Sequence, residues 1–304
     1  MVKLTVFTPA YNRAHTLPRT YESLVKQDCK EFIWLIIDDG STDQTEALVR
    51  KWQAVDSGFE IRYIYKPNGG MHTAHNTAYE NIDTEINVCI DSDDSMAEGA
   101  VSAILNKWEE VKEKGYAGLI GLDADVYGRI IGKVFSENLM ETTLSEYYAS
   151  GGSGDKKLVY RTDIMKKYPP YPIFEGEKYV PLSYKYLLCD QEYKLAVINR
   201  IICVVDYQPD GSSATMWKQY LMNPNGFSVI RKLDMIYPNS KRKLFIATVH
   251  YISCCFLAHK NILSSSPRKL ITFFLIPIGW ILSKYVKYKA NYLEKKNDKV
   301  FSRY

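Results

Sequence analysis

The sequence predicts an α/β fold in which a mostly parallel sheet is covered by helices on both faces. Three observations support this class of fold. Apolar segments of strand length alternate with helix-like segments through the first part of the chain, and a polar loop follows each strand-like segment. The composition of the 304 residues, with 46% hydrophobic and 24% charged residues, is that of a globular protein. It argues against a disordered chain, a collagen or a coiled coil.

Four strand–helix repeats are expected before residue 115. The segment 3–8 (KLTVFT) is rich in β-branched residues and ends at a proline, and the segment 32–38 (FIWLIID) is a nearly continuous apolar run, as in strands buried on both faces. The first helix should begin at Thr16, a plausible cap, with Pro18 in its first turn. We expect the other strands at 61–65 and 86–91, and the other helices at 44–53, after 70 and at 98–114.

Polar loops follow the four expected strands. In a parallel sheet the carboxyl ends of the strands lie at one edge, and ligands bind there. Each loop alone could be an ordinary turn, and DDGSTD alone is most simply a turn with a helix cap. Four such loops at one edge indicate a binding site, and they are residues 9–13, 38–43, 68–70 and 91–94.

The fourth loop concentrates three carboxylates, Asp91, Asp93 and Asp94. Because they repel one another, they must either splay into solvent or share a divalent cation. Alternate residues of an extended chain point the same way, so Asp91 and Asp93 can face one ligand. Mg²⁺ and Mn²⁺ bind one or two carboxylates together with phosphate oxygens and water, so the pattern favours a metal–diphosphate site.

Two other nucleotide-binding folds lack their motifs here. The turn after the first strand reads TPAYNR instead of GxGxxG, and the chain has no GxxxxGK[ST]. These absences argue against a dinucleotide-dependent oxidoreductase and a P-loop nucleotidase.

The four loops together resemble those of the family 2 glycosyltransferases. The motifs are FTPAYNR, DDGSTD, NGG and DSDD, at 7–13, 38–43, 68–70 and 91–94. The resemblance covers about residues 1–125. It also reaches three later segments that are similar to bacterial enzymes of capsular, exopolysaccharide or other surface-glycan synthesis, at 154–168, 174–181 (FEGEKYVP) and 207–213 (YQPDGSS).

The resemblance implies the A-type glycosyltransferase fold, a Rossmann-like sheet flanked by helices, here with a helical C-terminal extension. We expect a nucleotide-sugar (donor) lobe at 1–125, an acceptor lobe at 126–235 and the extension at 236–304, a possible membrane-association region. In the donor lobe, the resemblance implies that Pro9, Tyr11 and Arg13 line the pocket for the base and the phosphate. It implies that Asp39 accepts a hydrogen bond from the uracil imide and that Gly70 belongs to the donor site.

The resemblance also assigns roles to the three carboxylates of the fourth loop. Asp91 would lie near the ribose, Asp93 would hold a Mn²⁺ or Mg²⁺ that bridges the diphosphate, and Asp94 would face the donor sugar. The third loop departs from the pattern, because Met71 stands where relatives often have a basic residue. The neighbouring His72 and His75, one helical turn apart, are expected to line the donor cleft rather than to bind zinc.

An inverting transfer needs a carboxylate that deprotonates the acceptor hydroxyl. It should come from the second lobe, where the candidates are Glu175, Glu177, Asp190 and Glu192. The motif FEGEKYVP stands where the family usually presents its acidic motif, so we favour Glu177, then Glu175, then Asp190. Many relatives carry an adjacent Glu-Asp pair that this chain lacks.

The C-terminal segment is apolar and then basic. Residues 270–283 (LITFFLIPIGWILS) are nearly all hydrophobic but fall short of the roughly 20 residues that a membrane-spanning helix needs. Residues 284–304 contain seven Lys or Arg and two Asp or Glu. A buried helix is one interpretation. We favour a monotopic membrane anchor, or a surface for a membrane partner, with the basic tail on anionic lipid, and we rank a true span last. This arrangement does not suggest nucleic-acid binding.

The cysteines and the N-terminus favour the cytosol. None of the six cysteines forms a CxxC pair and several lie in apolar runs, as buried free thiols do. The N-terminal residues run into a strand without the apolar core of a signal peptide. We therefore expect a cytoplasmic protein, peripheral on the inner face of the cell membrane.

We interpret the chain as an inverting, metal-dependent glycosyltransferase of bacterial surface-polysaccharide synthesis. It would move a hexose or N-acetylhexosamine from a UDP-sugar to a hydroxyl of a lipid-linked or oligosaccharide acceptor. A processive synthase would need several spanning helices. The alternative from another class is a non-catalytic subunit that keeps the fold and binds UDP and a partner transferase at the membrane. The sequence leaves open whether a partner glycosyltransferase or a second copy of the chain assembles with it.

Overall fold

The computed structural model describes residues 2–208 and 215–301, and the side chains up to residue 292. The predicted YQPDGSS segment therefore lies mostly outside the described residues. The chain forms two compact units. The first unit consists of Met1–Tyr171 and Lys185–Tyr207, and the second unit of Pro172–Tyr184 and Gln208–Tyr304.

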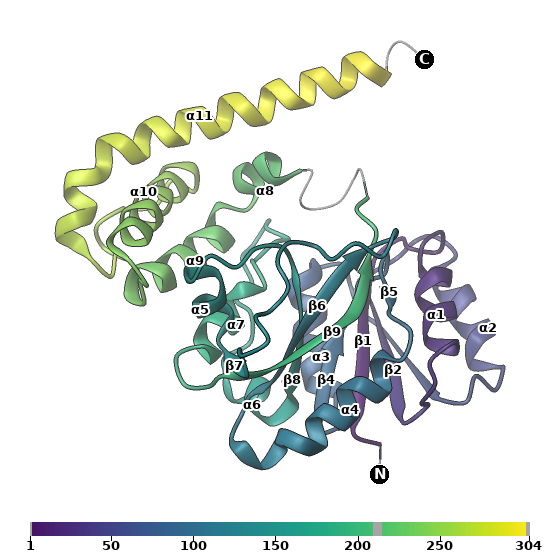
Figure 1. The fold of residues 1–304 in the computed structure, drawn as a ribbon. Helices are drawn as coiled ribbons and strands as arrows, with labels where there is room; N and C mark the ends of the chain where they lie inside the picture. The colour runs from purple at the N-terminus through teal and green to yellow at the C-terminus, as the bar shows by residue number, and fades with distance from the viewer. Residues whose placement is uncertain (1, 209–214, 302–304) are drawn as a thin grey trace. The chain divides into compact units, whose positions relative to one another are not determined.

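A single nine-stranded sheet forms the centre of the first unit (Figure 1). The strand order is β3-β2-β1-β4-β8-β6-β9-β5, and β7 pairs with β9 beside this path. The strands are β1 (Leu4–Ala10), β2 (Phe32–Asp38), β3 (Glu60–Tyr65), β4 (Ile86–Cys89), β5 (Ser95–Met96), β6 (Gly118–Asp125), β7 (Glu141–Thr142), β8 (Lys156–Arg161) and β9 (Leu195–Val205).

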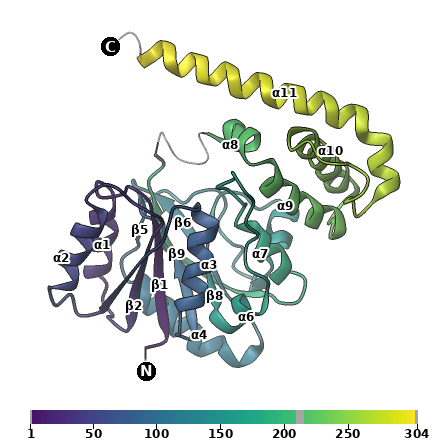
Figure 2. The ribbon, with the colours of Figure 1, turned by 180° about the vertical axis from the view of Figure 1, so that it is seen from behind.

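The four predicted strands β1 to β4 are present and parallel, which confirms the expected class of fold. Val6 of β1 pairs with Trp34 of β2 on one side and with Val88 of β4 on the other. All residues of β1 and β2 are buried, because helices cover both faces of the sheet. Figure 1 shows α4 (Ala100–Val111) in front of the sheet, and Figure 2, seen from behind, shows α3 (Met71–Asn81) in front of it.

The sheet continues beyond residue 125, where the sequence analysis placed a lobe boundary. β8 is antiparallel to both β4 and β6, whereas β9 is parallel to β6. These ladders hold residues 156–161 and 195–205 in the same unit as the first four strands. The compact units thus have other bounds than 125 and 235, and the donor and acceptor roles of the chain's parts stay predictions.

The predicted helices of the first unit are also present. The segment expected at 98–114 forms α4 followed by one short 3₁₀ turn, η1 (Lys112–Lys114). Thr16 precedes the first helix without a side-chain capping bond, and the helix has its proline in the first turn as predicted. The remaining helices are α1 (Leu17–Val25), α2 (Thr45–Gln53), α5 (Leu144–Ala149), α6 (Thr162–Lys167) and α7 (Ser183–Cys189), of which α7 begins in the second unit.

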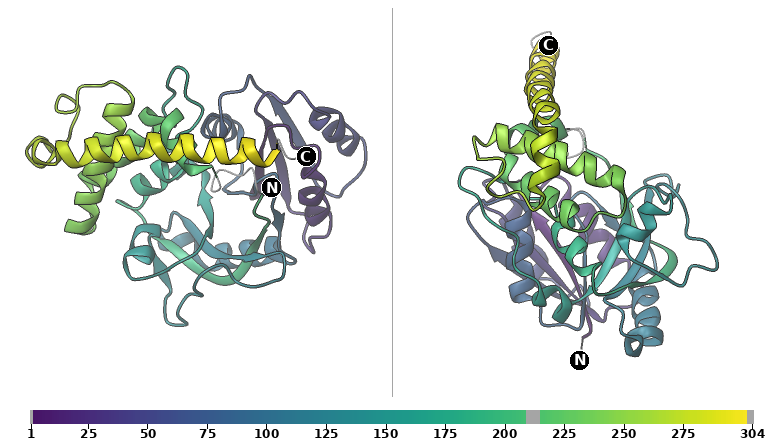
Figure 3. Two further views of the ribbon diagram at one scale, coloured as in Figure 1. Left: turned by 90° about the horizontal axis from the view of Figure 1, so that it is seen from above. Right: turned by 90° about the vertical axis from the view of Figure 1, so that its left-hand side faces the viewer.

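The second unit is helical, and its helices are α8 (Met216–Met222), α9 (Pro224–Ile236), α10 (Lys241–Leu257) and α11 (Lys269–Phe301). α10 packs on α9 and on α11 around Met235, Tyr251 and Ile252. A glycine is required where α11 meets α10, because a Cβ on Gly279 would lie 2.4 Å from Ile252 Cγ2. Figure 3 shows α11 as a long rod. Pro277 lies inside it, and a proline removes one helical hydrogen bond and bends a helix.

α11 buries its small side chains and exposes its large apolar ones. Its buried positions include Thr272, Gly279, Ser283, Val286 and Ala290. Its exposed side chains include Leu270, Phe273, Phe274, Ile278, Trp280, Ile281, Tyr285, Tyr288 and Tyr292. The segment Lys269–Tyr292 is long and apolar enough to cross a membrane, by length and composition alone. Its most apolar stretch of 18 residues has a mean hydropathy of 1.4, and only 22% of that stretch is buried. The helix is thus longer than the 14-residue apolar segment suggested.

Candidate active site

The loops after β1 and β2 are joined by hydrogen bonds at the carboxyl edge of the sheet. The Asn12 amide donates to Ser41 Oγ (2.8 Å), and Asn12 Oδ1 accepts from the Thr42 amide (2.8 Å). Asn12 adopts a positive φ of 54°, a conformation that asparagine tolerates better than most residues. The predicted convergence of these two loops is confirmed.

The predicted donor residues of the first loop differ in accessibility. Pro9 is a buried residue of β1 that pairs with Ile37. Tyr11 is exposed, with 48% of its surface accessible. Arg13 is half-buried, and its guanidinium charge acts on Asp93 of the fourth loop by lowering the pKa of that carboxyl. Tyr11 and Arg13 are therefore the members of this set that a ligand can reach.

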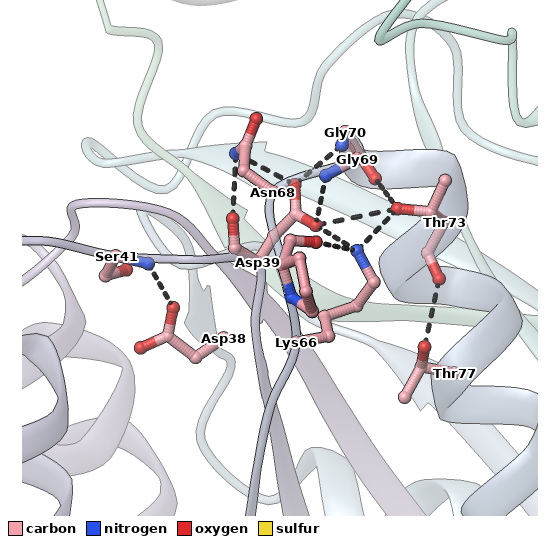
Figure 4. Close-up of polar contacts among 10 residues, drawn as sticks. Asp38, Asp39, Ser41, Lys66, Asn68, Gly69, Gly70, Thr73 and Thr77 are labelled. Atoms are coloured by element: carbon pink, nitrogen blue, oxygen red, sulfur yellow. Dashed lines mark hydrogen bonds and ion pairs between the residues drawn. The ribbon is translucent and has the colours of Figure 1, made fainter. Parts of the chain in front are cut away.

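Asp39 joins the loop after β2 to the loop after β3 (Figure 4). Its carboxylate is only 3% exposed and accepts hydrogen bonds from the Gly69 amide (3.0 Å) and the Gly70 amide (2.7 Å). It also accepts from Asn68 Nδ2 (3.2 Å) and forms an ion pair with Lys66 Nζ. A carboxylate offers about four lone-pair positions, so protein donors occupy them all.

This arrangement gives Asp39 a structural role beside the predicted one. A uracil imide could bond to it only by replacing one of the present donors, of which the Thr73 hydroxyl makes the longest bond (3.5 Å). Lys66, whose side chain is only 17% exposed, was not among the predicted site residues. The signal available was a cation at the end of an expected strand, directly before a Pro-Asn-Gly turn.

Replacing Asp39 by alanine is expected to lower the free energy of unfolding by about 3 kcal/mol, because Lys66 would remain partly buried without its partner. Urea unfolding of both proteins measures the difference. The control is Asp56→Ala, which removes an exposed carboxylate. Equal midpoints for the two variants would contradict the structural role of Asp39.

The neighbouring Asp38 and Gly40 shape the turn of the second loop. Asp38 accepts from the Ser41 amide (2.7 Å) and from the Tyr63 hydroxyl (2.6 Å). Gly40 has a φ of +84°, and a Cβ there would lie 2.7 Å from the Asn68 backbone nitrogen. The DDG motif therefore brings the second and third loops into close approach.

The two histidines of the third loop do not line a cleft, so that expectation is wrong. Gly70, at a φ of 94°, begins α3, and His72 and His75 on this helix are 1% and 0% exposed. Burial lowers the pKa of each imidazole to about 4, so both are neutral at pH 7. His75 packs against the rings of Phe7 and Tyr171. They are interior residues because the apolar side of α3 faces the sheet.

Asp94 is enclosed by the end of β9. Its Oδ1 accepts from the Asp206 amide (3.1 Å), and Cys203 Sγ lies 3.7 Å from its Oδ2. The pKa of Asp94 is raised to about 7. Burial is the largest cause, the charge of Lys157 opposes the rise, and the charge of Asp91 adds to it. Asp94, which was predicted to face the donor sugar, is therefore only 5% exposed.

Lys157 and Asp123 extend this polar cluster, and the sequence analysis missed both. Asp123 at the end of β6 is 2% exposed, and its Oδ1 has no hydrogen-bond partner among the described residues. Burial raises the pKa of Asp123 to about 6, and the charge of Lys157 opposes that rise. Lys157 lies on β8, which joins the sheet out of sequence order, so spacing along the chain gave no signal.

Asp91 and Asp93 fit a divalent cation. Both are half-buried. Burial raises the pKa of Asp93, and the negative charge of Asp91 adds to that rise, so the two carboxylates repel each other at short range. Within the described ranges, no group of three or more His, Cys, Asp or Glu residues could hold a metal. Mg²⁺ and Mn²⁺ sites commonly use one or two carboxylates and complete the shell with phosphate and water.

The three candidate bases have different surroundings. Glu177 Oε1 accepts from the Asn225 amide (2.9 Å) and side chain (2.6 Å), and its Oε2 accepts from the Gly226 amide (2.8 Å). These amides belong to the first turn of α9, so Glu177 caps that helix within the second unit. Its oxygens are engaged in holding the fold.

Asp190 has a similar structural role in the first unit. Its Oδ2 accepts from the Ser145 amide (2.8 Å) and hydroxyl (2.6 Å) at the start of α5. Glu175, in contrast, is exposed, and no hydrogen bond to its carboxylate occurs in the part of the chain that the structure describes. Of the three, Glu175 is the carboxylate available to an external hydroxyl.

The comparisons with known proteins identify the class of this site. Residues 5–133 match the family model "Glycosyl transferase family 2". The chain is 31% identical over 123 residues to a Campylobacter jejuni GalNAc(5)-diNAcBac-PP-undecaprenol beta-1,3-glucosyltransferase, covering 40% of this chain and 38% of the relative. It is 33% identical over 109 residues to the Staphylococcus epidermidis teichoic acid poly(glycerol phosphate) polymerase, covering 36% and 15%. The chain thus spans well under half of these relatives.

Solved structures show the same fold. The S. aureus TarS fragment 1–349 in complex with UDP-GlcNAc superposes with a TM-score of 0.60 at 20% identity, covering 84% of this chain and 72% of that one. The mannosyltransferase PcManGT from Pyrobaculum calidifontis, in complex with GDP-Man and Mn²⁺, gives 0.54 at 15% identity, covering 95% and 83%.

The chain has the A-type glycosyltransferase fold that was predicted. Its residues 5–133 match the model of glycosyl transferase family 2, so the resemblance noted in the sequence is confirmed.

Proposed function

We propose that the chain transfers a sugar from a UDP-sugar to an acceptor hydroxyl with inversion at the anomeric carbon. The observation that carries this proposal is the set of loops joined at the carboxyl edge of the sheet, with Asp91 and Asp93 near Arg13, within the residues that match the family. The carboxylate pair at this edge would hold a cation and the arginine would bind phosphate oxygens, which together suit a nucleoside diphosphate.

Each residue of the proposed donor site has a proposed role. Asp93 with Asp91 would hold a Mn²⁺ or Mg²⁺, which supplies charge neutralisation for the departing UDP. Arg13 would bind the diphosphate, and the exposed ring of Tyr11 would contact the base. Asp39 would accept a hydrogen bond from the uracil imide, which would replace the bond from one of its present donors.

The surroundings of the three candidate bases favour Glu175 as the general base. A base must have an oxygen within hydrogen-bond reach of the acceptor hydroxyl. Glu177 and Asp190 direct their oxygens at the first turns of α9 and α5. Glu175 would take the acceptor proton while the acceptor oxygen attacks the anomeric carbon from the face opposite UDP.

UDP release tests the proposal. The purified chain is incubated with a panel of UDP-sugars and Mn²⁺, and released UDP is measured with and without a chelator. Metal-dependent release from one donor would support transfer and identify the sugar. UDP binding without release from any donor, even with added membrane lipid extract, would favour the non-catalytic subunit. Absence of UDP binding would contradict the assignment of the loops.

The proposed acceptor is a lipid-linked glycan of bacterial surface-polysaccharide synthesis, such as a capsule, met at the inner face of the cell membrane. The name of the Campylobacter jejuni relative describes an undecaprenol-linked substrate for that protein. The exposed apolar face of α11 supports contact with a membrane for this chain. Arg268 and Lys269 precede that face, and Lys284, Lys287 and Lys289 lie towards its end, as suits anionic lipid.

The double variant Phe274→Asp/Ile281→Asp is expected to bind phosphatidylglycerol vesicles at least about tenfold more weakly than the wild type, because both side chains would be buried in lipid. Co-sedimentation measures the affinity. The matched control is Val55→Asp/Val126→Asp, which adds the same charge at exposed valines of the first unit. Equal binding of both double variants would remove α11 as the membrane contact.

A further inference from the structure

The second unit contains a pocket of about 380 Å³ that the proposed reaction does not use. Its walls come from α9, from the C-terminal part of α10 and from the loop between α10 and α11, with Phe174 beside them. The buried side chains of Tyr251, Cys254 and Cys255 line its interior. The loop side is exposed to solvent, so a ligand can enter there.

The pocket is positively charged. Lys232 and Lys260 line it, and the lining contains no aspartate or glutamate. Lys232 Nζ lies 5.8 Å from the centre of the Tyr251 ring, and Lys260 Nζ lies 5.5 Å from the centre of the Phe174 ring. Neither ammonium has a carboxylate within ion-pair distance across the described residues.

The charges of Lys232 and Lys260 both act on the Cys255 thiol in the pocket wall. Burial raises the pKa of the Cys255 thiol, whereas Lys232 and Lys260 each lower it. The ammonium group of Lys232 on α9 and that of Lys260 in the loop therefore both lie near this cysteine. An anion between them would neutralise two charges at once.

Polar groups complete the lining. The Ser228 and Ser264 hydroxyls border the pocket and donate to the backbone oxygens of Asn225 and Asn261, and Ser265 Oγ is hydrogen-bonded to the Tyr251 hydroxyl. Asn261 Oδ1 accepts from the backbone amides of Leu263 (3.1 Å) and Ser264 (3.0 Å), which fixes the loop and leaves the Asn261 side-chain NH₂ group for a ligand. Two ammonium groups and one side-chain amide thus remain as donors to an anion in the pocket.

We propose that this pocket binds the phosphate group of a phosphate-bearing ligand. A phosphate monoester carries up to two negative charges and three terminal acceptor oxygens, which match the paired lysines and the surrounding donors. The inference rests on the pocket alone and does not depend on the proposed transfer reaction.

The phosphate has two possible sources. The loop that forms the pocket leads directly to Arg268, Lys269 and the apolar face of α11, so the phosphate of a membrane lipid could enter from that side. A soluble phosphate compound could enter from solvent. The chemistry of recognition is the same in both cases.

Titration with inorganic phosphate at constant ionic strength tests the site. Binding to the full chain is followed by isothermal calorimetry and by the melting temperature. The variant Lys232→Met/Lys260→Met is expected to bind phosphate about tenfold more weakly or worse, because two charge-assisted contacts are lost. The matched control Lys51→Met/Lys114→Met removes the same charge from exposed helix positions of the first unit and should bind as the wild type does.

Vesicles separate the two sources. Phosphatidic acid exposes a phosphate monoester, whereas phosphatidylglycerol carries its charge on a diester. Preferential binding of phosphatidic acid vesicles by the wild type, lost in the lysine pair variant, would support a lipid phosphate. A soluble ligand would be supported if the lysine pair variant lost binding of inorganic phosphate while its binding of phosphatidic acid vesicles equalled that of the wild type.

The proposal is overturned if the wild type, the control pair and the lysine pair variant respond equally to inorganic phosphate, or if none responds. Should the double variant fail to fold, Lys260→Met alone provides the test, since this lysine is exposed and lies outside the helices. An affinity for inorganic phosphate equal to that of the wild type would then contradict the site.

Discussion

Replacing Asp93 by alanine is expected to lower the rate of metal-dependent UDP release by about 10³-fold. Asp93 is one of two carboxylates that would hold the cation, and loss of a group that stabilises developing charge on a leaving group costs several kcal/mol in the transition state. The half-buried position of Asp93 beside Asp91, with Arg13 nearby, is what makes the effect large. Initial rates at increasing Mn²⁺ measure it, and the apparent Mn²⁺ affinity should fall in parallel.

The matched control is Asp83→Ala in the same unit. Asp83 is exposed and pairs only with Arg62 at the surface, so its loss should leave the rate within about twofold of the wild type. The metal assignment would be wrong if Asp93→Ala retained the wild-type dependence on Mn²⁺. Comparable melting temperatures for both variants would show that any loss of rate is not a folding defect.

Replacing Glu175 by glutamine is expected to lower kcat by about 10³-fold while UDP binding stays unchanged, because a general base contributes to the chemical step and not to donor affinity. The glutamine keeps the size and polarity of the exposed side chain, so the melting temperature should not change. Single-turnover rates with a donor that supports UDP release, together with a UDP titration, measure both quantities.

Glu177→Gln is the matched comparison two residues away. It weakens a cap that makes three hydrogen bonds to the start of α9, so we expect a loss of about 1–2 kcal/mol of stability and a smaller loss of kcat. The reverse pattern, with an inactive but equally stable Glu177→Gln and an active Glu175→Gln, would assign the base to Glu177, as the sequence alone favoured.

The first half of the fold could be predicted from the sequence because its signals are local. The apolar runs that form β1, β2, β3 and β4 end in polar loops, and each of these strands has a parallel neighbour among the other three. Such repeats allow few topologies. The proposed site residues Arg13, Asp39, Asp91 and Asp93 lie in these loops, and the resemblance to the family implied their roles.

The residues that the sequence analysis missed come from strands and segments that join the site out of order. Lys157 on β8 and Asp123 on β6 meet Asp94 only because β8 inserts between β4 and β6. The ion pair of Asp39 with Lys66 likewise depends on how two loops cross. Spacing along the chain does not encode such contacts.

The sequence by itself determined the class of fold, the parallel sheet and the polar loops at its carboxyl edge. Only the tertiary structure decided which polar groups remain accessible. It buried His72 and His75, engaged Glu177 as a helix cap, left Glu175 exposed and turned the large apolar side chains of α11 outward. The physical reason is that burial and hydrogen-bond partners are set by packing between distant segments, whereas strand and loop patterns are set by neighbours along the chain.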